Sequence, residues 1–347
     1  MGKYGGGRKG AAEDWMDDEH SSMRSLKSQT RKKKKGIGEK EALSLEEGNA
    51  TVSEVYKNQC RVVTDDGKEP LCAYRRTQVW AQANSRNELK ERSPVAVGDR
   101  VKISRITDRD GIVEGVCERK NQLARPAPDR EEEAIHVIVA NLDCLVIVVS
   151  AKNPEFSPGI VDRFLVAEVR QGIPVVIAVT KTDLLAPDDD RPWELYRQLG
   201  YDVHEIATKR HEGVEKLRAS LDGKHIAFCG HSGVGKTSLL SALTATTVGQ
   251  VADVNEFTGK GRHTTSSARI IRTDQNNFWV DTPGVREFGL IGVTPENLKE
   301  HFPEMANLPC EASGCLHEEE AGCAARTLPR YVGYARILAS LREDGAV

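Results

Sequence analysis

Unbroken apolar runs in the middle of the chain constrain its fold more than any other feature. Residues 145–149 read Leu-Val-Ile-Val-Val and residues 175–179 read Val-Val-Ile-Ala-Val, the pattern of strands buried on both faces of a parallel sheet. Apolar residues at helical spacing lie between them, at 160–171, and shorter apolar strands follow at 226–229 and 278–280. This alternation predicts an α/β doubly wound sheet, which binds ligands at the carboxyl ends of its strands.

A glycine-rich turn follows the strand at 226–229. Residues 230–237 match the phosphate-binding loop G-x-x-x-x-G-K-[ST] in full, and helical spacing follows from Lys236 to Leu243. In such a P-loop the backbone N–H groups surround nucleotide phosphates, the lysine reaches the β- and γ-phosphates, and the hydroxyl binds Mg²⁺. We therefore predict catalytic roles for Lys236 and Thr237, with Thr237 as a magnesium ligand. The predicted nucleotide-binding residues are Gly230, His231, Ser232, Gly233, Val234, Gly235, Lys236, Thr237 and Ser238.

The strand at 175–179 is followed by a four-residue motif, called the base-reading motif below because it predicts recognition of the nucleotide base. Its residues are Thr180, Lys181, Thr182 and Asp183. They are similar to the [NT]-K-x-D element of GTPases, whose carboxylate accepts hydrogen bonds from N1 and N2 of guanine. Adenine lacks this donor pair, so GTP is the predicted substrate and GDP the product. Asparagine is commoner than threonine at the first position, and we expect Thr180 to remove an amide that braces the P-loop.

A third motif, D-x-P-G, follows the strand at 278–280. Asp281 can hold the magnesium shell, and the N–H of Gly284 can contact the γ-phosphate. The base-reading motif therefore precedes the P-loop, whereas ordinary GTPases begin with the P-loop and end with the base-reading motif. A circular permutation gives the order found in this chain. The D-x-P-G motif then leads directly into residues 291–347, and we expect loss of the γ-phosphate to move this C-terminal part.

The N-terminal third has the pattern of a small β-barrel. Turn signals at 65–67, 97–99 and 110–111 separate short, roughly alternating segments. These strand-like segments lie at 50–52, 60–64, 79–81 and 101–103. Five or so short strands suit an OB-like barrel, and an SH3-like barrel would have much the same pattern. An excess of basic residues favours a barrel that faces nucleic acid, although surface charges are usually only solvated.

The net charge of −3 is unevenly divided along the chain. It is +6 over residues 1–125 and −9 over the rest. Residues 1–47 include five consecutive basic residues, at 31–35, and few apolar ones, which predicts a disordered basic leader. This leader is either a solubilising tail or a tether to nucleic-acid phosphates. No apolar run reaches the roughly eighteen residues of a membrane span, so we expect no membrane partner and a cytoplasmic location.

Four metal-binding side chains lie close together near the C-terminus. They are Cys310, Cys315, His317 and Cys323, within fourteen residues. Three thiolates and one imidazole make a closed tetrahedral set, which is typical of a structural zinc ion; the alternative is three free cysteines and a surface histidine. Apolar residues at helical spacing follow at 328–341. The other five cysteines belong to no motif and are predicted to be core residues.

In its combination of motif order, N-terminal barrel and C-terminal Cys/His cluster, the chain resembles the circularly permuted ribosome small-subunit-dependent GTPase A family. The resemblance covers roughly residues 48 to 340 and includes Gly-Arg-His-Thr-Thr at 261–265, in the switch I position, and the extended D-x-P-G motif at 281–288. The predicted fold is multidomain α/β. Its parts are a leader at 1–47, an OB-like barrel at 48–125, a permuted GTPase domain at 126–290 and a zinc-binding helical domain at 291–347.

The resemblance assigns further site residues. Thr264, or Thr265 next to it, is expected to bind Mg²⁺ and the γ-phosphate. His263 is either the group that assists hydrolysis or an exposed loop histidine. Val285 stands where Ras-like enzymes carry the glutamine that orients the attacking water, so we expect slow intrinsic hydrolysis that a partner accelerates. Ala207 and Thr208 are expected to back the guanine base.

The sequence thus predicts a GTP hydrolase that acts as a switch in late maturation of the small ribosomal subunit. It would use Mg²⁺ and one structural Zn²⁺, bind the subunit and its rRNA, act as a monomer, and be activated by the subunit. The alternative is an RNA- or ribosome-binding scaffold whose nucleotide site has little turnover. A P-loop ATPase or kinase is disfavoured by Asp183.

Overall fold

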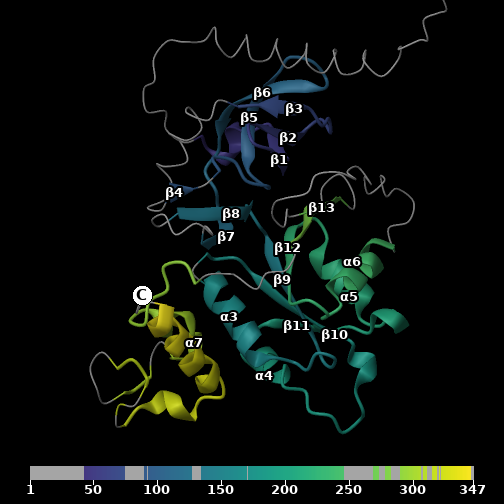
Figure 1. Cartoon of the computed structure of the whole chain (residues 1–347). Helices are drawn as coiled ribbons and strands as arrows, with labels where there is room; N and C mark the ends of the chain where they lie inside the picture. The colour runs from purple at the N-terminus through teal and green to yellow at the C-terminus, as the bar shows by residue number, and fades with distance from the viewer. Residues whose placement is uncertain are drawn as a thin grey trace, which may run out of the picture.

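The computed structural model contains a small barrel, a central sheet and a C-terminal helical module (Figure 1). The described residues are 43–74, 90–91, 93–126, 134–169, 171–245, 269–272, 278–282, 290–305, 308–310, 315–318, 320 and 322–344. The predicted leader and the predicted strand at 79–81 lie outside them, apart from the leader's last residues. Within the described ranges, no helix is long and apolar enough to cross a membrane.

The first strands close into a barrel in the order β1-β2-β3-β6-β5. Strands β3 and β6 pair in parallel and the other neighbours pair antiparallel. Residues such as Val52, Val62 and Val101 are fully buried inside the barrel. The closed barrel of five strands confirms the predicted OB-like barrel. The elements are η1 (Leu45–Glu47), β1 (Ala50–Val55), β2 (Gln59–Thr64), β3 (Leu71–Ala73), β5 (Arg100–Arg105) and β6 (Asp110–Val116).

A three-stranded sheet beneath the barrel was not predicted from the sequence. Its order is β4-β8-β7, from β4 (Lys90–Glu91), β7 (Gln122–Pro126) and β8 (Ala134–Ala140). Strand β7 runs across the boundary that the sequence suggested between residues 125 and 126. The prolines at 126 and 128 indicate a linker in the sequence, but Pro126 ends an edge strand, where its missing N–H is tolerated.

A buried ionic cluster joins this small sheet to the barrel. The Arg119 guanidinium donates to both carboxylate oxygens of Asp99, at 2.6 and 2.8 Å, and to Glu91 at 2.9 Å. The Arg119 side chain is 5% exposed and the two carboxylates are fully buried. Asp99 directly precedes β5 and Glu91 ends β4, so the cluster fixes the barrel on the sheet.

The central sheet has the order β11-β10-β9-β12-β14-β13, with only β13 antiparallel. This confirms the doubly wound sheet. Its strands are β9 (Cys144–Ser150), β10 (Val175–Thr180), β11 (Asp202–Glu205), β12 (His225–Cys229), β13 (Arg269–Arg272) and β14 (Phe278–Asp281). Its helices are α3 (Pro158–Val169), α4 (Glu194–Gln198), α5 (Val214–Leu221) and α6 (Lys236–Ala245). Two short turns, η2 (Thr182–Leu184) and η3 (Thr208–Arg210), follow β10 and β11.

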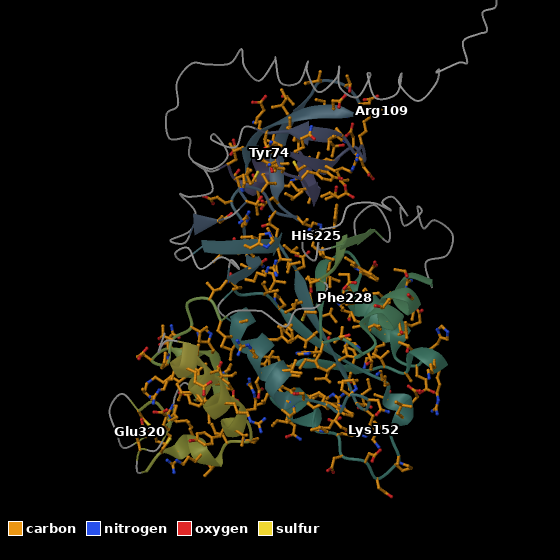
Figure 2. All side chains as sticks on the ribbon, viewed as in Figure 1. Tyr74, Arg109, Lys152, His225, Phe228 and Glu320 are labelled. Atoms are coloured by element: carbon orange, nitrogen blue, oxygen red, sulfur yellow. The ribbon has the colours of Figure 1, made fainter. Side chains whose placement is uncertain are left out.

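Both faces of the sheet are covered by helices. Leu145 and Ile147 of β9 share a core with α3 and α4, whereas Val146 and Val148 share another with α5 and α6. All seven residues of β9 are buried, which explains its unbroken apolar run. Side chains fill the layers between sheet and helices, and Phe228 of β12 lies among them in the middle of the molecule (Figure 2).

The C-terminal module packs against α3. It consists of η4 (Leu298–His301), η5 (Pro303–Met305), η6 (Ala324–Thr327) and α7 (Tyr331–Asp344). Phe302, Tyr334 and Leu338 share one core with Val166 of α3. The helix begins three residues later than the pattern at 328–341 suggests. The module therefore takes part of its core from the central domain, as a small domain with few apolar residues of its own must.

Replacing Arg119 with methionine should lower the free energy of unfolding by about 3–5 kcal/mol, because two carboxylates stay buried without a counter-charge. Lys120→Met is the matched control, since Lys120 pairs with Asp143 at an exposed site and should cost at most about 1 kcal/mol. Urea unfolding followed by circular dichroism measures both. Equal losses in the two variants would show that the cluster does not hold barrel and sheet together.

Candidate nucleotide-binding site and metal centre

The P-loop connects β12 to α6 at the carboxyl end of the central sheet. Gly230, its first residue, has a φ of +155°, and a Cβ atom there would lie 2.3 Å from the Val148 carbonyl oxygen of β9. Only glycine permits this turn so close to the neighbouring strand. The loop ends where α6 begins, with Thr237 and Ser238 on its first turn. Backbone N–H groups at such a helix start attract anions.

The P-loop lysine contacts the D-x-P-G motif. Nζ of Lys236 lies 2.5 Å from Oδ1 of Asp281 and donates to the Thr282 carbonyl at 2.6 Å. The Thr282 hydroxyl in turn donates to the Phe228 carbonyl of β12 at 2.8 Å. These contacts arise because β12 and β14 are paired neighbours. The structure thus brings together an ammonium that can neutralise phosphate charge and a carboxylate that can hold a magnesium ion.

The base-reading motif is tied to the other side of the P-loop. The hydroxyl of Thr180, which is 1% exposed, lies within hydrogen-bond reach of two carbonyl oxygens, that of Val149 at 3.0 Å and that of Val234. Threonine lacks the amide that asparagine would supply at this position, and its hydroxyl makes a contact with the P-loop of its own. Lys181 adds a second tie, since its Nζ donates to the Gly233 carbonyl at 2.6 Å.

Lys181 also contacts Asn153, a residue that the sequence did not predict to be part of the site. The backbone of Lys181 is left-handed, with a φ of +58°, and its Nζ donates to the carbonyl of Asn153 as well. Asn153 lies in the loop after β9, between the P-loop and the base-reading motif. The signal for it is positional: any residue just beyond the carboxyl end of a central strand faces the ligand side of such a sheet.

The remaining predicted base contacts lie beside this motif. Asp183 is in η2, and the N–H of Thr182 donates to the Ile206 carbonyl at 3.3 Å. Ala207 is buried and Thr208 begins η3. These residues therefore gather at the ends of the adjacent strands β10 and β11. His263, Thr264, Gly284 and Val285 lie outside the described residues, so their roles stay predictions.

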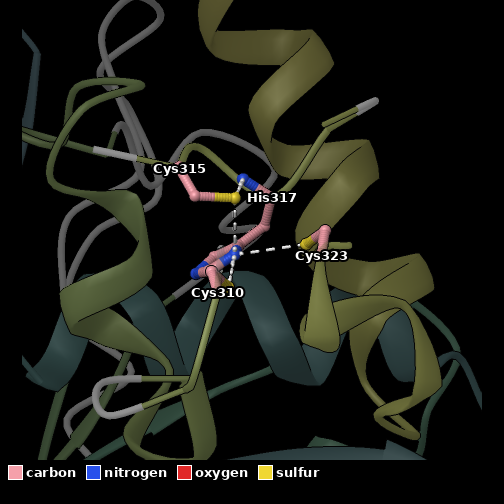
Figure 3. A group of neighbouring side chains, drawn as sticks. All are labelled: Cys310, Cys315, His317 and Cys323. Carbon is pink, nitrogen blue, oxygen red and sulfur yellow. Dashed lines mark hydrogen bonds between the residues drawn. The ribbon is translucent and has the colours of Figure 1, made fainter. Parts of the chain in front are cut away.

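The four predicted metal ligands converge in the C-terminal module (Figure 3). Nδ1 of His317 lies 3.4 Å from the Sγ atoms of Cys310, Cys315 and Cys323. Metal bonds of about 2.3 Å to sulfur and 2.0 Å to nitrogen at tetrahedral angles would separate nitrogen and sulfur by about 3.5 Å. All four ligand atoms lie within 4.8 Å of one another, so the cluster could hold a metal ion.

Residues around the cluster hold its loop in shape. Glu320 accepts hydrogen bonds from the N–H groups of Leu316 at 2.8 Å and Glu318 at 2.7 Å. The Tyr334 hydroxyl donates to the Leu316 carbonyl at 2.6 Å, and its ring meets that of His317 edge-on at 5.8 Å. Burial raises the pKa of Cys315 to about 11 and lowers that of His317. A metal must therefore displace a thiol proton at Cys315.

The fold and the convergence of the three motifs define a circularly permuted P-loop GTPase. The sequence model of the RsgA GTPase family matches residues 116–291. The small ribosomal subunit biogenesis GTPase RsgA 2 of Bacteroides thetaiotaomicron is 31% identical over 300 residues, covering 82% of this chain and 94% of the relative. The corresponding RsgA of Chlorobaculum tepidum is 37% identical over 270 residues, covering 72% and 86%. The chain belongs to the RsgA GTPase family.

Solved structures agree with this assignment. YjeQ from Thermotoga maritima superposes with a TM-score of 0.62 at 29% identity, covering 85% of this chain and 98% of that chain. YloQ, a circularly permuted GTPase, superposes with a TM-score of 0.61 at 24% identity, covering 86% and 96%. At that identity the second match shows the fold alone.

Replacing Thr180 with valine should weaken GDP binding by roughly tenfold, because a buried P-loop carbonyl loses its donor. Thr180→Ser keeps the hydroxyl and should bind within about threefold of the unchanged chain. Titration with a fluorescent GDP analogue measures both affinities. If valine binds GDP as tightly as threonine does, the brace between β10 and the P-loop contributes nothing.

Proposed function

We propose that this chain hydrolyses GTP to GDP and phosphate with Mg²⁺. The observation that carries the proposal is the double attachment of the P-loop, to Asp281 through Lys236 and to the base-reading motif through Lys181 and Thr180. Segments about fifty residues apart on either side of the loop thereby meet in one site. Asp183 disfavours an ATPase or kinase, because adenine lacks the pair of donors that this carboxylate would accept from.

Each part of the site has a proposed role. The P-loop N–H groups and Lys236 neutralise the phosphates, and Asp183 reads guanine against a backing from Ala207 and Thr208. Thr237 and Thr264 ligate Mg²⁺, Asp281 holds its water shell, and the N–H of Gly284 contacts the γ-phosphate. The protein thus supplies positioning and charge stabilisation, which account for most of phosphoryl-transfer catalysis.

The proposed partner is the small ribosomal subunit. The relatives named above are small ribosomal subunit biogenesis GTPases, and a valine at position 285 in place of a water-orienting glutamine favours a reaction that needs a partner's help. We propose that this chain binds the maturing subunit as a monomer in the cytoplasm, with the barrel against rRNA, and that GTP hydrolysis releases it. His263 is the proposed hydrolytic group of this chain.

We further propose that the metal is Zn²⁺ in a structural role. Three thiolates and one imidazole leave no open position for a substrate or water. The nitrogen–sulfur distances of 3.4 Å support a tetrahedral ion. The metal then stabilises the module at 291–347 in addition to the core that this module shares with α3. The other proposed domains are the barrel at 48–125 and the GTPase domain at 126–290.

Purified small subunits should accelerate single-turnover GTP hydrolysis by at least about tenfold, because an enzyme that lacks the water-orienting glutamine gains transition-state stabilisation from its partner. Lys236→Ala is the control and should show no acceleration. Equal rates with and without subunits would contradict activation. Tight subunit binding without faster turnover would instead identify the RNA-binding scaffold.

The purified chain should contain stoichiometric zinc by elemental analysis, and Cys323→Ser should lose most of it and unfold at lower temperature, because the site contributes folding energy. Cys60→Ser is the matched control, since Cys60 is a buried barrel residue far from the cluster in the fold. Retention of zinc in Cys323→Ser would contradict the assignment of this ligand set.

A further inference from the structure

A second buried ionic cluster lies between the C-terminal module and the central domain. Nε of Arg330, just before α7, donates to Oδ1 of Asp162 on α3 at 2.8 Å. Its Nη1 donates to both carboxylate oxygens of Glu304 in η5, at 3.1 and 3.2 Å. The Arg330 and Asp162 side chains are 1% and 2% exposed. One guanidinium therefore links carboxylates that belong to two parts of the fold.

Aromatic rings and helix α7 pack around Arg330 and Asp162. The guanidinium lies over the Phe302 ring, with its central carbon 4.5 Å from the ring centroid. The Tyr196 hydroxyl of α4 lies 3.0 Å from Oδ1 of Asp162. A Cβ atom at Gly333 would lie 2.0 Å from Oδ2 of Asp162, so the glycine leaves room for this carboxylate against α7. Such a packed and charged contact has one arrangement of low energy.

The same helix supports the metal loop. Tyr334 packs edge-on against Phe302 with ring centroids 5.3 Å apart, while its hydroxyl holds the Leu316 carbonyl. Leu290 and Val293, the residues that lead from the D-x-P-G motif into the module, pack in the same core. The metal loop, α7 and α3 are thus one continuous packed body.

We propose that Arg330 fixes the C-terminal module on α3 in a single orientation throughout the nucleotide cycle. The module then does not swing when the γ-phosphate is lost, contrary to what the order of motifs suggests. It presents the metal-bound loop and α3 to a partner as one rigid surface. Only the reference to a nucleotide cycle rests on the proposed function; the anchor itself does not.

The test measures the distance between the module and the far face of the central sheet. Spin labels are attached through a genetically encoded ketone amino acid at Lys216 on α5 and Ala339 on α7, both exposed. Double electron–electron resonance measures the distance between the two labels, once with GDP and once with a non-hydrolysable GTP analogue. We expect coincident distance distributions. A shift between the two nucleotides overturns the proposal.

Variants separate the anchor from the function. Arg330→Met should broaden the distribution and Glu304→Gln should broaden it less, whereas Arg342→Met, which removes an exposed arginine of the same helix, should leave it unchanged. Circular dichroism verifies that each variant is folded. Because Glu304→Gln keeps a neutral oxygen that can accept from Arg330, this variant remains informative if Arg330→Met unfolds. A narrow distribution in both variants overturns the anchor. The variants are also compared without nucleotide, and this comparison tests the anchor by itself. Failure of the unlabelled chain to bind the GTP analogue would therefore contradict only the proposed function.

Discussion

The position of β12 in the middle of the central sheet determines the rest of the site. This strand pairs in parallel with β9 on one side and β14 on the other. The P-loop at its carboxyl end therefore lies between Asp281, at the end of β14, and the base-reading motif, at the end of β10. Parallel pairing alone brings these ends to one edge. The order in which the chain visits the strands has no effect on this geometry, which is why a permuted chain can keep the whole site.

Much of this could be predicted from the sequence, because the signals are local or periodic. The run at 145–149 identified a strand buried on both faces, and both faces of β9 are indeed covered. The four metal ligands lie within fourteen residues, so their spacing alone indicated the cluster. What was missed depends on pairs far apart in the chain. Asp162 and Arg330 are separated by 168 residues, and no local pattern marks either as a member of an ionic joint.

The charge pattern of the barrel has a different meaning in the structure. Several of its basic residues face carboxylates: Arg100 pairs with Asp65 at 2.7 Å and Arg105 with Asp66 at 2.8 Å, while Arg119 is buried. Paired and buried charges release few counterions on binding RNA. Three of the barrel's basic residues are thus engaged within the fold, and the proposed rRNA contact rests on the family rather than on the charge count of the sequence.

Three separated motifs should form a single guanine-nucleotide site, and calorimetric titration can show whether they do. The chain is titrated with GDP and with ADP in the presence of Mg²⁺, and Asp183→Ala is treated in the same way. We expect binding of GDP, no measurable binding of ADP, and loss of this preference in the variant. Equal affinity of the unchanged chain for the two nucleotides would contradict this expectation.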